Sequence, residues 1–214
     1  MNLLYLLLLA RLRYLGPLRF TIYGIWRSLN LRRYKADVIY FDNLNIFDEI
    51  NNLDIFNISM DQIRDISNKY NFNCNINDYY SYFTANIIPF LGDSIYSHPL
   101  SNCDDGYIDI LSMSKKTKGS KFRLMKLLIN QDTGDYFNKT TNTNTFSEFK
   151  SSSNLKDLRC NQGISYIKTK GFLIKPTNPK GLTQNYSIDG ERYPLNNALV
   201  KIVPSSLKIF GYIK

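Results

Sequence analysis

Apolar residues dominate the start of the chain at a spacing typical of helices. Residues 2–30 are mostly apolar with arginines interspersed, and Gly16-Pro17 interrupts this pattern. Because a glycine followed by a proline rarely continues a helix, we predict two helices that meet at this point. The second helix would present an apolar face formed by Phe20, Tyr23, Ile25 and Trp26.

Strand-like patterns begin beyond these helices and are interrupted by one polar segment. Residues 36–41 predict a first strand. Residues 42–79 contain ten asparagines in 38 positions, and we interpret them as an inserted, partly helical surface segment. Strand character resumes over 82–88 and again over 107–113, just after the turn residues Asp104-Asp105-Gly106.

The remaining residues predict one helix followed by strands. The helix spans 121–130, and a polar loop follows over 138–154. The predicted closing strands are 164–175, 184–189, 196–203 and 207–213. Since this last part is all β, we expect a sandwich or a curved sheet. The fold class is therefore predicted as α+β, mainly β, with 1–41 and 80–214 forming one domain around the 42–79 insertion.

Charge is distributed unevenly along the chain, whose formal net charge is +9. Residues 1–40 carry seven basic and one acidic side chain, a net of +6. Residues 41–114 carry two basic and eleven acidic side chains (−9), and residues 115–214 carry eighteen basic and six acidic ones (+12). A basic–acidic–basic layout indicates a phosphate-bearing partner such as a nucleotide, a nucleic acid or an anionic lipid surface, with a merely solvated face as the alternative.

Cysteine, histidine and hydropathy patterns exclude several classes of protein. Three cysteines are widely spaced and form no CxxC pair, which disfavours a disulfide framework and a zinc site. His98 is the single histidine, so histidine-rich metal sites are excluded, and we expect His98 itself to be structural. No stretch of 18 or more residues is apolar enough for an ordinary membrane-spanning helix.

Four short patterns follow one another in a fixed order. They are Arg13 to Thr21, Asp104 to Asp109, the helix from Arg123 to Leu128 with Gly134-Asp135-Tyr136 behind it, and Asp189-Gly190-Glu191 between two strands. Each pattern alone is common: an Asp-Gly pair between strands is usually a hairpin turn, and an arginine on an apolar helix usually reaches solvent. Their order carries more information than any one of them.

Together these patterns resemble the C-terminal half of the diacylglycerol kinase-like lipid kinases, and most closely the sphingosine (long-chain-base) kinases. Residues 15–21, LGPLRFT, are similar to the family's LGxxRFT segment, and residues 101–110 are similar to its xLDDGxIDL segment. Residues 187–191, SIDGE, are similar to its xxDGE element. The resemblance covers most of residues 11–214 outside 42–79 and 138–160. Ceramide kinases share the DGE element, but the RFT segment favours the sphingosine branch.

The resemblance implies a β-sandwich C-terminal domain, ATP and Mg²⁺ as cofactors, and a sphingoid base or related lipid as substrate. It assigns Arg13 and Arg19 to the nucleotide, and arginine binds phosphate oxygens as a forked donor. It also brings Asp189, Gly190 and Glu191 to the nucleotide site, where a carboxylate holds Mg²⁺ or a hydroxyl. The residues expected to line the lipid pocket are Phe20, Tyr23 and Trp26.

Asp104 and Asp105 are interpreted differently. An Asp-Asp-Gly turn orders itself through hydrogen bonds from its own side chains, so a structural role is favoured. A bound structural cation at these two carboxylates is the alternative.

Two departures from the family stand out. The family's N-terminal domain has a Gly-Gly-Asp-Gly loop and the catalytic aspartate, whereas none of the eleven glycines here is adjacent to another. We therefore expect the catalytic aspartate to belong to an N-terminal kinase lobe missing from these 214 residues. In addition, Leu6 stands where the family has an aspartate that engages the lipid head group.

The alternatives are a diacylglycerol or ceramide kinase, and an inactive module that binds a lipid or a membrane surface. We expect no nucleic-acid partner, because no zinc, helix-turn-helix or RNA-recognition pattern accompanies the positive charge. The apolar residues 1–9 are followed by Arg11 and Arg13 rather than by small cleavage-site residues, which disfavours secretion. The expected localisation is cytoplasmic, with peripheral membrane association.

Overall fold

The structure is a computed structural model of the 214-residue chain. It describes residues 33–43, 45, 50, 58–70, 74–91, 95–115, 120–131, 158–160, 164–177 and 185–203. The predicted helices within 2–30, the polar loop 138–154 and the predicted strand 207–213 lie outside the described residues.

The described elements are two helices and eleven strands. The helices are α4 (Met60–Tyr70) and α5 (Lys121–Asn130). The strands are β1 (Tyr34–Phe41), β2 (Cys74–Asn86), β3 (Phe90–Leu91), β4 (Ile95–Tyr96), β5 (Ile108–Ser114), β6 (Leu158–Cys160), β7 (Ile164–Thr169), β8 (Gly171–Pro176), β9 (Asn185–Ile188), β10 (Glu191–Pro194) and β11 (Ala198–Lys201). The predicted α+β, mainly β class is confirmed.

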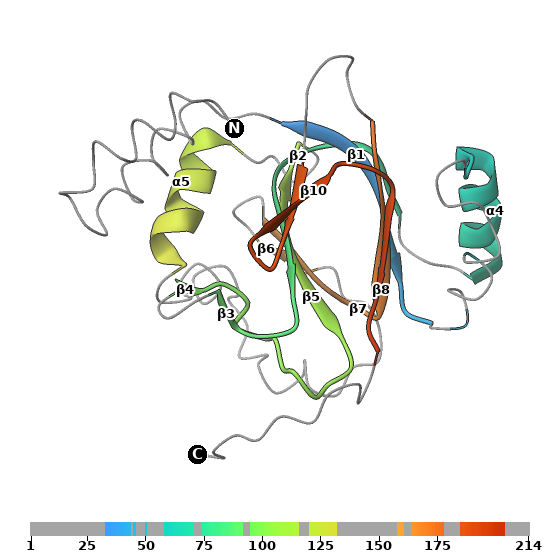
Figure 1. Cartoon of the computed structure of the whole chain (residues 1–214). Coiled ribbons are helices and arrows are strands. Elements are labelled where there is room, and N and C mark those ends of the chain that lie inside the picture. Colours follow the sequence, from blue (N-terminus) through green and yellow to red (C-terminus); the bar gives the residue numbers. More distant parts are fainter. Residues whose placement is uncertain are drawn as a thin grey trace.

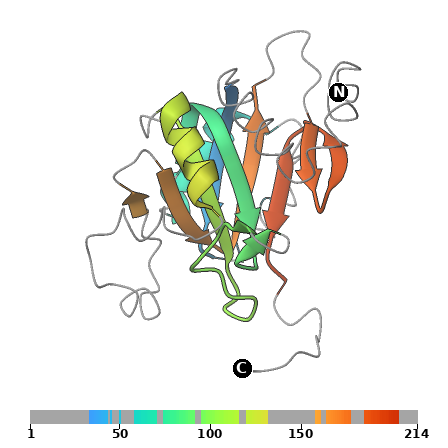
Figure 2. The ribbon, with the colours of Figure 1, turned by 90° about the vertical axis from the view of Figure 1, so that its left-hand side faces the viewer.

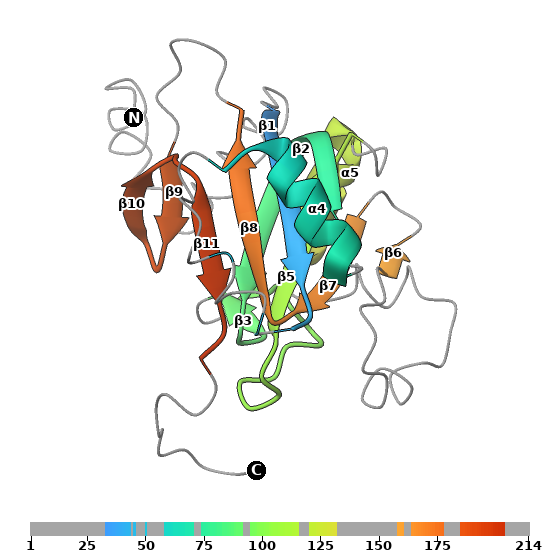
Figure 3. The same ribbon diagram turned by 90° about the vertical axis from the view of Figure 1, so that its right-hand side faces the viewer.

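Seven of these strands form one antiparallel sheet in the order β11-β8-β1-β2-β5-β7-β6. The sheet is strongly curved, and α4 and α5 lie on opposite sides of its outer face (Figure 1). The hairpins β9–β10 and β3–β4 form two separate small sheets. Figure 3 shows β9–β10 beside β11, away from α4.

Residue alternation along the strands gives the sheet two apolar faces. The inner face is a cluster of buried side chains from β1, β2, β5, β7 and β8: Ala36, Val38, Tyr40, Tyr80, Ile108, Ile110, Ile167, Phe172 and Ile174. Tyr186 of β9 packs against this cluster. On the outer face, Leu124 and Leu127 of α5 pack against Leu111, Met113 and Tyr166. Burial on both faces explains why β1 and β5 are apolar along most of their length.

Both helices begin where the sequence supplies a capping side chain. The hydroxyl of Ser120 accepts a hydrogen bond from the Arg123 amide at 3.3 Å, so α5 begins at Lys121 as predicted. At the start of α4, the Gln62 amide donates a hydrogen bond to Oγ of Ser59 at 3.2 Å, and the Ser59 amide donates one to Oε1 of Gln62 at 2.8 Å. This reciprocal pair is a capping box. The partly helical character predicted for 42–79 is thus found at 60–70.

Three predicted strand boundaries were wrong. Strand β2 begins at Cys74, inside the range interpreted as an insertion, because its first residues pair with β1. The predicted strand 164–175 is two strands, β7 and β8, which separate at Lys170 and pair with different neighbours. Residues 87 and 88, predicted as strand, form a bend after β2.

Candidate functional site

The Asp-Gly-Glu element forms the tip of the β9–β10 hairpin. Asp189 and Gly190 have φ angles of 49° and 87°, and the Ile188–Glu191 pair closes the loop. A two-residue turn with both φ angles positive favours Asp-Gly, because aspartate tolerates this region and glycine adopts it without strain. The geometry of the turn thus explains by itself why aspartate and glycine occupy positions 189 and 190.

The acidic side chains of this hairpin are exposed. Asp189 and Glu191 are both open to solvent. The hydroxyl of Tyr193 donates a hydrogen bond to Oε2 of Glu191 at 2.9 Å and so orients that carboxylate. Two exposed carboxylates around a glycine have the oxygen chemistry that suits a hydroxyl donor or a hard cation such as Mg²⁺.

The second acidic motif forms a self-bonded turn that leads into β5. Oδ1 of Asp105 accepts a hydrogen bond from the Tyr107 amide at 2.9 Å, and Gly106 has a φ of 72°. This is the side-chain-ordered turn that the sequence predicted. Asp104 is exposed on the same loop.

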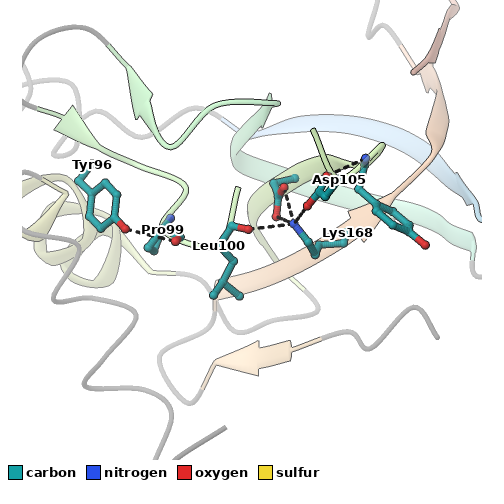
Figure 4. A network of polar contacts seen from close by, with 7 residues as sticks. Tyr96, Pro99, Leu100, Asp105 and Lys168 are labelled. Atoms are coloured by element: carbon teal, nitrogen blue, oxygen red, sulfur yellow. Dashed lines mark hydrogen bonds and ion pairs between the residues drawn. The ribbon is translucent and has the colours of Figure 1, made fainter. Parts of the chain in front are cut away.

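A single ammonium group joins this turn to the sheet (Figure 4). Nζ of Lys168 lies 2.8 Å from Oδ2 of Asp105 and 2.9 Å from the carbonyl oxygen of Leu100. It also lies 3.0 and 2.9 Å from the two carboxylate oxygens of Asp109, its register partner across β5 and β7. Burial raises the pKa of the Asp109 carboxyl, and the positive charge of Lys168 opposes that shift.

His98 lies fully buried near this group. Its Nδ1 is 2.8 Å from Oγ of Ser97 and 3.1 Å from Nδ2 of Asn86, and its ring centroid is 6.1 Å from that of Tyr166. Burial lowers the pKa of His98 to about 4, a hydrogen bond with the Thr84 backbone opposes this shift, and the charge of Lys168 adds to it. This interior position agrees with a structural histidine.

The described residues among the predicted site residues thus lie in two separate groups. Asp189, Gly190 and Glu191 share one exposed hairpin, and Asp104 and Asp105 share one loop. The other predicted residues lie outside the described part of the chain: Arg13, Arg19, Phe20, Tyr23 and Trp26.

The cation site suggested at Asp104 and Asp105 stays a prediction. Lys168 already supplies a positive charge to Asp105. Within the described ranges, no group of three or more histidine, cysteine, aspartate or glutamate side chains is placed to hold a metal ion. No described helix has the length and apolar character needed to cross a membrane.

Sequence reasoning missed the partnership of Lys168 with Asp109. A signal was present, because Lys168 is the one charged residue in the strand segment 164–169 and Asp109 is the one charged residue in 108–114. A single charge in an otherwise apolar strand indicates a paired group.

No family model matches this chain, and a search of curated proteins found no match.

Proposed function

We propose that this chain is the C-terminal lobe of a sphingosine kinase-like lipid kinase, built as the β-sandwich domain of that family. The reaction would transfer the γ-phosphoryl group of ATP to the primary hydroxyl of a sphingoid long-chain base. The observation that carries the proposal is the exposed Asp189-Gly190-Glu191 hairpin tip, which comes after the Asp104-Asp105-Gly106 turn in the order that the family has. The mainly β fold is compatible with it.

In this proposal the nucleotide is held by charge complementarity. Asp189 and Glu191 would face Mg²⁺ or the ribose hydroxyls, and Arg13 and Arg19 would bind phosphate oxygens. Bound ATP supplies the phosphoryl group, and Mg²⁺ neutralises its developing charge. The exposed carboxylates fit this role, because Asp189 and Glu191 are open to solvent, whereas Oδ2 of Asp105 is paired with Lys168.

The lipid would be shielded from water by apolar side chains. The inner face of the sheet offers a continuous apolar cluster with Phe83 and Ala85 only partly buried. Phe20, Tyr23 and Trp26 would complete the lining. The proton of the substrate hydroxyl would pass to an aspartate of the N-terminal kinase lobe, in keeping with the resemblance.

A non-enzymatic lipid- or membrane-binding module is the second candidate. It is favoured by the bulky apolar side chains that remain exposed on the β3–β4 hairpin. In either role we propose a cytoplasmic protein with peripheral membrane association.

The test uses the native protein, isolated with an antibody to its C-terminus. Its intact mass is compared with 24.9 kDa, and it is assayed with labelled ATP and Mg²⁺ against sphingosine, diacylglycerol and ceramide in detergent micelles. We expect a larger mass and phosphorylation of sphingosine above the other two lipids. Absence of product with all three lipids would overturn the kinase proposal, and preference for diacylglycerol or ceramide would reassign the substrate.

Paired variants make this assay specific to the hairpin. Asp189→Asn keeps the turn and removes a charge, so it should lower kcat/KM by at least tenfold, roughly the loss of one metal-directed carboxylate. Asp65→Asn removes an exposed charge from helix α4 and serves as the matched control.

A further inference from the structure

The β3–β4 hairpin and the bend that leads into it expose an unusual number of bulky apolar side chains. They are Ile87 (45 % exposed), Ile88 (49 %), Phe90 (47 %), Leu91 (39 %) and Ile95 (37 %). Among the described strands β3 and β4 pair only with each other, so the hairpin stands outside the main sheet. Single exposed apolar residues are ordinary, but a run of them on one short hairpin and the bend before it marks an interaction surface.

The hairpin is held in one shape from within. The rings of Phe90 and Tyr96 lie 4.8 Å apart, centroid to centroid. The Tyr96 hydroxyl donates to the carbonyl oxygen of Pro99 at 3.2 Å (Figure 4). The exposed side chains are therefore presented by an ordered scaffold.

Helix α5 adds exposed apolar and basic residues. Phe122 is 77 % exposed and Ile129 is 58 % exposed, and with Lys126 between them they have the spacing of one helix face. The opposite face buries Leu124 and Leu127, so Phe122 and Ile129 are not needed for the core. The helix contains Lys121, Arg123 and Lys126 and no acidic residue.

The hairpin and the helix belong to one side of the molecule. Figures 1 and 2 both show β3 and β4 beside one end of α5. Leu100, which follows β4, and Leu128, next to Ile129, pack against the same buried cluster. We name the exposed set Ile87, Ile88, Phe90, Leu91, Ile95, Phe122, Lys126 and Ile129 the α5–hairpin surface.

We propose that the α5–hairpin surface docks on an anionic lipid bilayer. The apolar side chains would enter the head-group region, while Lys121 and Lys126 would contact lipid phosphates. Charge complementarity favours a bilayer over a protein, because α5 offers lysine and no acid, whereas lysine is depleted at protein interfaces. The inference concerns binding alone and does not depend on kinase activity.

The test is flotation of the full chain with vesicles of phosphatidylcholine, with and without phosphatidylserine. The wild-type chain should float with the phosphatidylserine vesicles and lose that binding in high salt. Two variants should each weaken binding by roughly tenfold. The double variant Ile88→Ser/Phe90→Ser removes apolar contact with the bilayer, and Lys126→Glu reverses the charge that attracts the anionic lipids.

Matched controls lie on the β9–β10 hairpin and on β11. Ile188→Ser and Lys201→Glu change an exposed apolar and an exposed basic residue there, and both should float like the wild type. Circular dichroism and urea unfolding show whether each variant is folded. The proposal is overturned if the wild type does not float, if folded surface variants bind normally, or if the controls lose binding equally. A dimer in solution that Ile88→Ser/Phe90→Ser dissociates would assign the surface to a second copy instead.

Flotation requires neither ATP nor a sphingoid base. Failure here would therefore leave the kinase proposal untouched, and a protein that floats without phosphorylating lipids would support the second candidate function.

Discussion

Lys168 and Asp109 face each other across strands β7 and β5, with Nζ 2.9 and 3.0 Å from the two carboxylate oxygens. Asp109 is fully buried, whereas the lysine side chain is 20 % exposed and reaches on to Asp105. One ammonium thus compensates a buried carboxylate and fastens the Asp104-Asp105-Gly106 turn. We infer that the acidic motif is held in place from the strand opposite it.

Replacing Lys168 by methionine should destabilise the fold. The change leaves the Asp109 carboxylate buried without its cation, which costs roughly 3 kcal/mol. Urea unfolding at neutral pH measures this as a lower midpoint with an unchanged slope. Lys170→Met, two residues further along the chain at a partly exposed position, is the control and should cost less than about 1 kcal/mol.

The double variant Lys168→Met/Asp109→Asn separates charge from packing. Removing the carboxylate charge as well should recover more than half of the lost stability, because a neutral amide is far cheaper to bury than an unpaired anion. A double variant no more stable than Lys168→Met would show that the ion pair is not what holds this region.

The buried histidine should make stability depend on pH. The pKa of His98 is about 4 in the folded protein and 6.5 as a free side chain, so folding favours the neutral ring. Its contribution to stability is present above pH 6.5 and is lost as pH falls toward 4, by about 3 kcal/mol in total. The raised pKa of Asp109 acts with the opposite sign, since its protonated form is favoured by folding.

Comparison with His98→Asn isolates the histidine. The asparagine amide can take over the contact of Nδ1 with Ser97 and Asn86 but does not titrate. The free energy of unfolding, measured by urea at pH 7, 5.5 and 4, should fall more steeply with acid in the wild type than in the variant. Parallel curves would contradict a depressed pKa at His98.

Thr169 ties the β7–β8 connection to the end of β1. Its hydroxyl lies 2.8 Å from the carbonyl oxygen of Phe41 and accepts a hydrogen bond from the Phe41 amide at 3.1 Å. Thr169→Val keeps the shape but removes both side-chain contacts, while the Lys170 amide still donates to the Phe41 carbonyl at 2.9 Å, so the variant should cost roughly 1 kcal/mol in urea unfolding. Thr177→Val, at an exposed position, should change stability by less than about 0.5 kcal/mol. Equal effects would contradict this role.

The sequence predicted local elements better than their partners. Helix α5 was found with its boundaries because its apolar spacing is a local signal. The break at Lys170 was missed because it depends on Thr169 bonding to Phe41, 128 residues away. No local pattern reports a contact at that separation.

The same reason limits what could be predicted for the site. The Asp104-Asp105-Gly106 turn was predicted from its own residues, whereas a hairpin at Asp189-Gly190 was only the alternative interpretation of its Asp-Gly pair. The Lys168–Asp109 contact joins residues 59 apart and requires the register of β5 and β7. The exposure of Phe90 and Phe122 was not foreseen, because a strand or helix pattern does not show which apolar residues the core leaves uncovered.

Variants at Asp189 and Gly190 distinguish a structural role of this turn from a chemical role of the Asp189 carboxylate. Gly190 has a φ of 87°, and a Cβ added there would meet no atom within 4 Å, so Gly190→Ala is disfavoured only through the backbone. We expect a stability loss of about 1 kcal/mol, seen in urea unfolding. Asp189→Asn should leave stability within about 0.5 kcal/mol of the wild type, because Asn-Gly also suits this turn. If Asp189→Asn lowers lipid phosphorylation by the native enzyme at unchanged stability, the carboxylate serves the reaction. If the two variants lower activity only in proportion to their stability loss, the Asp-Gly pair serves the turn alone.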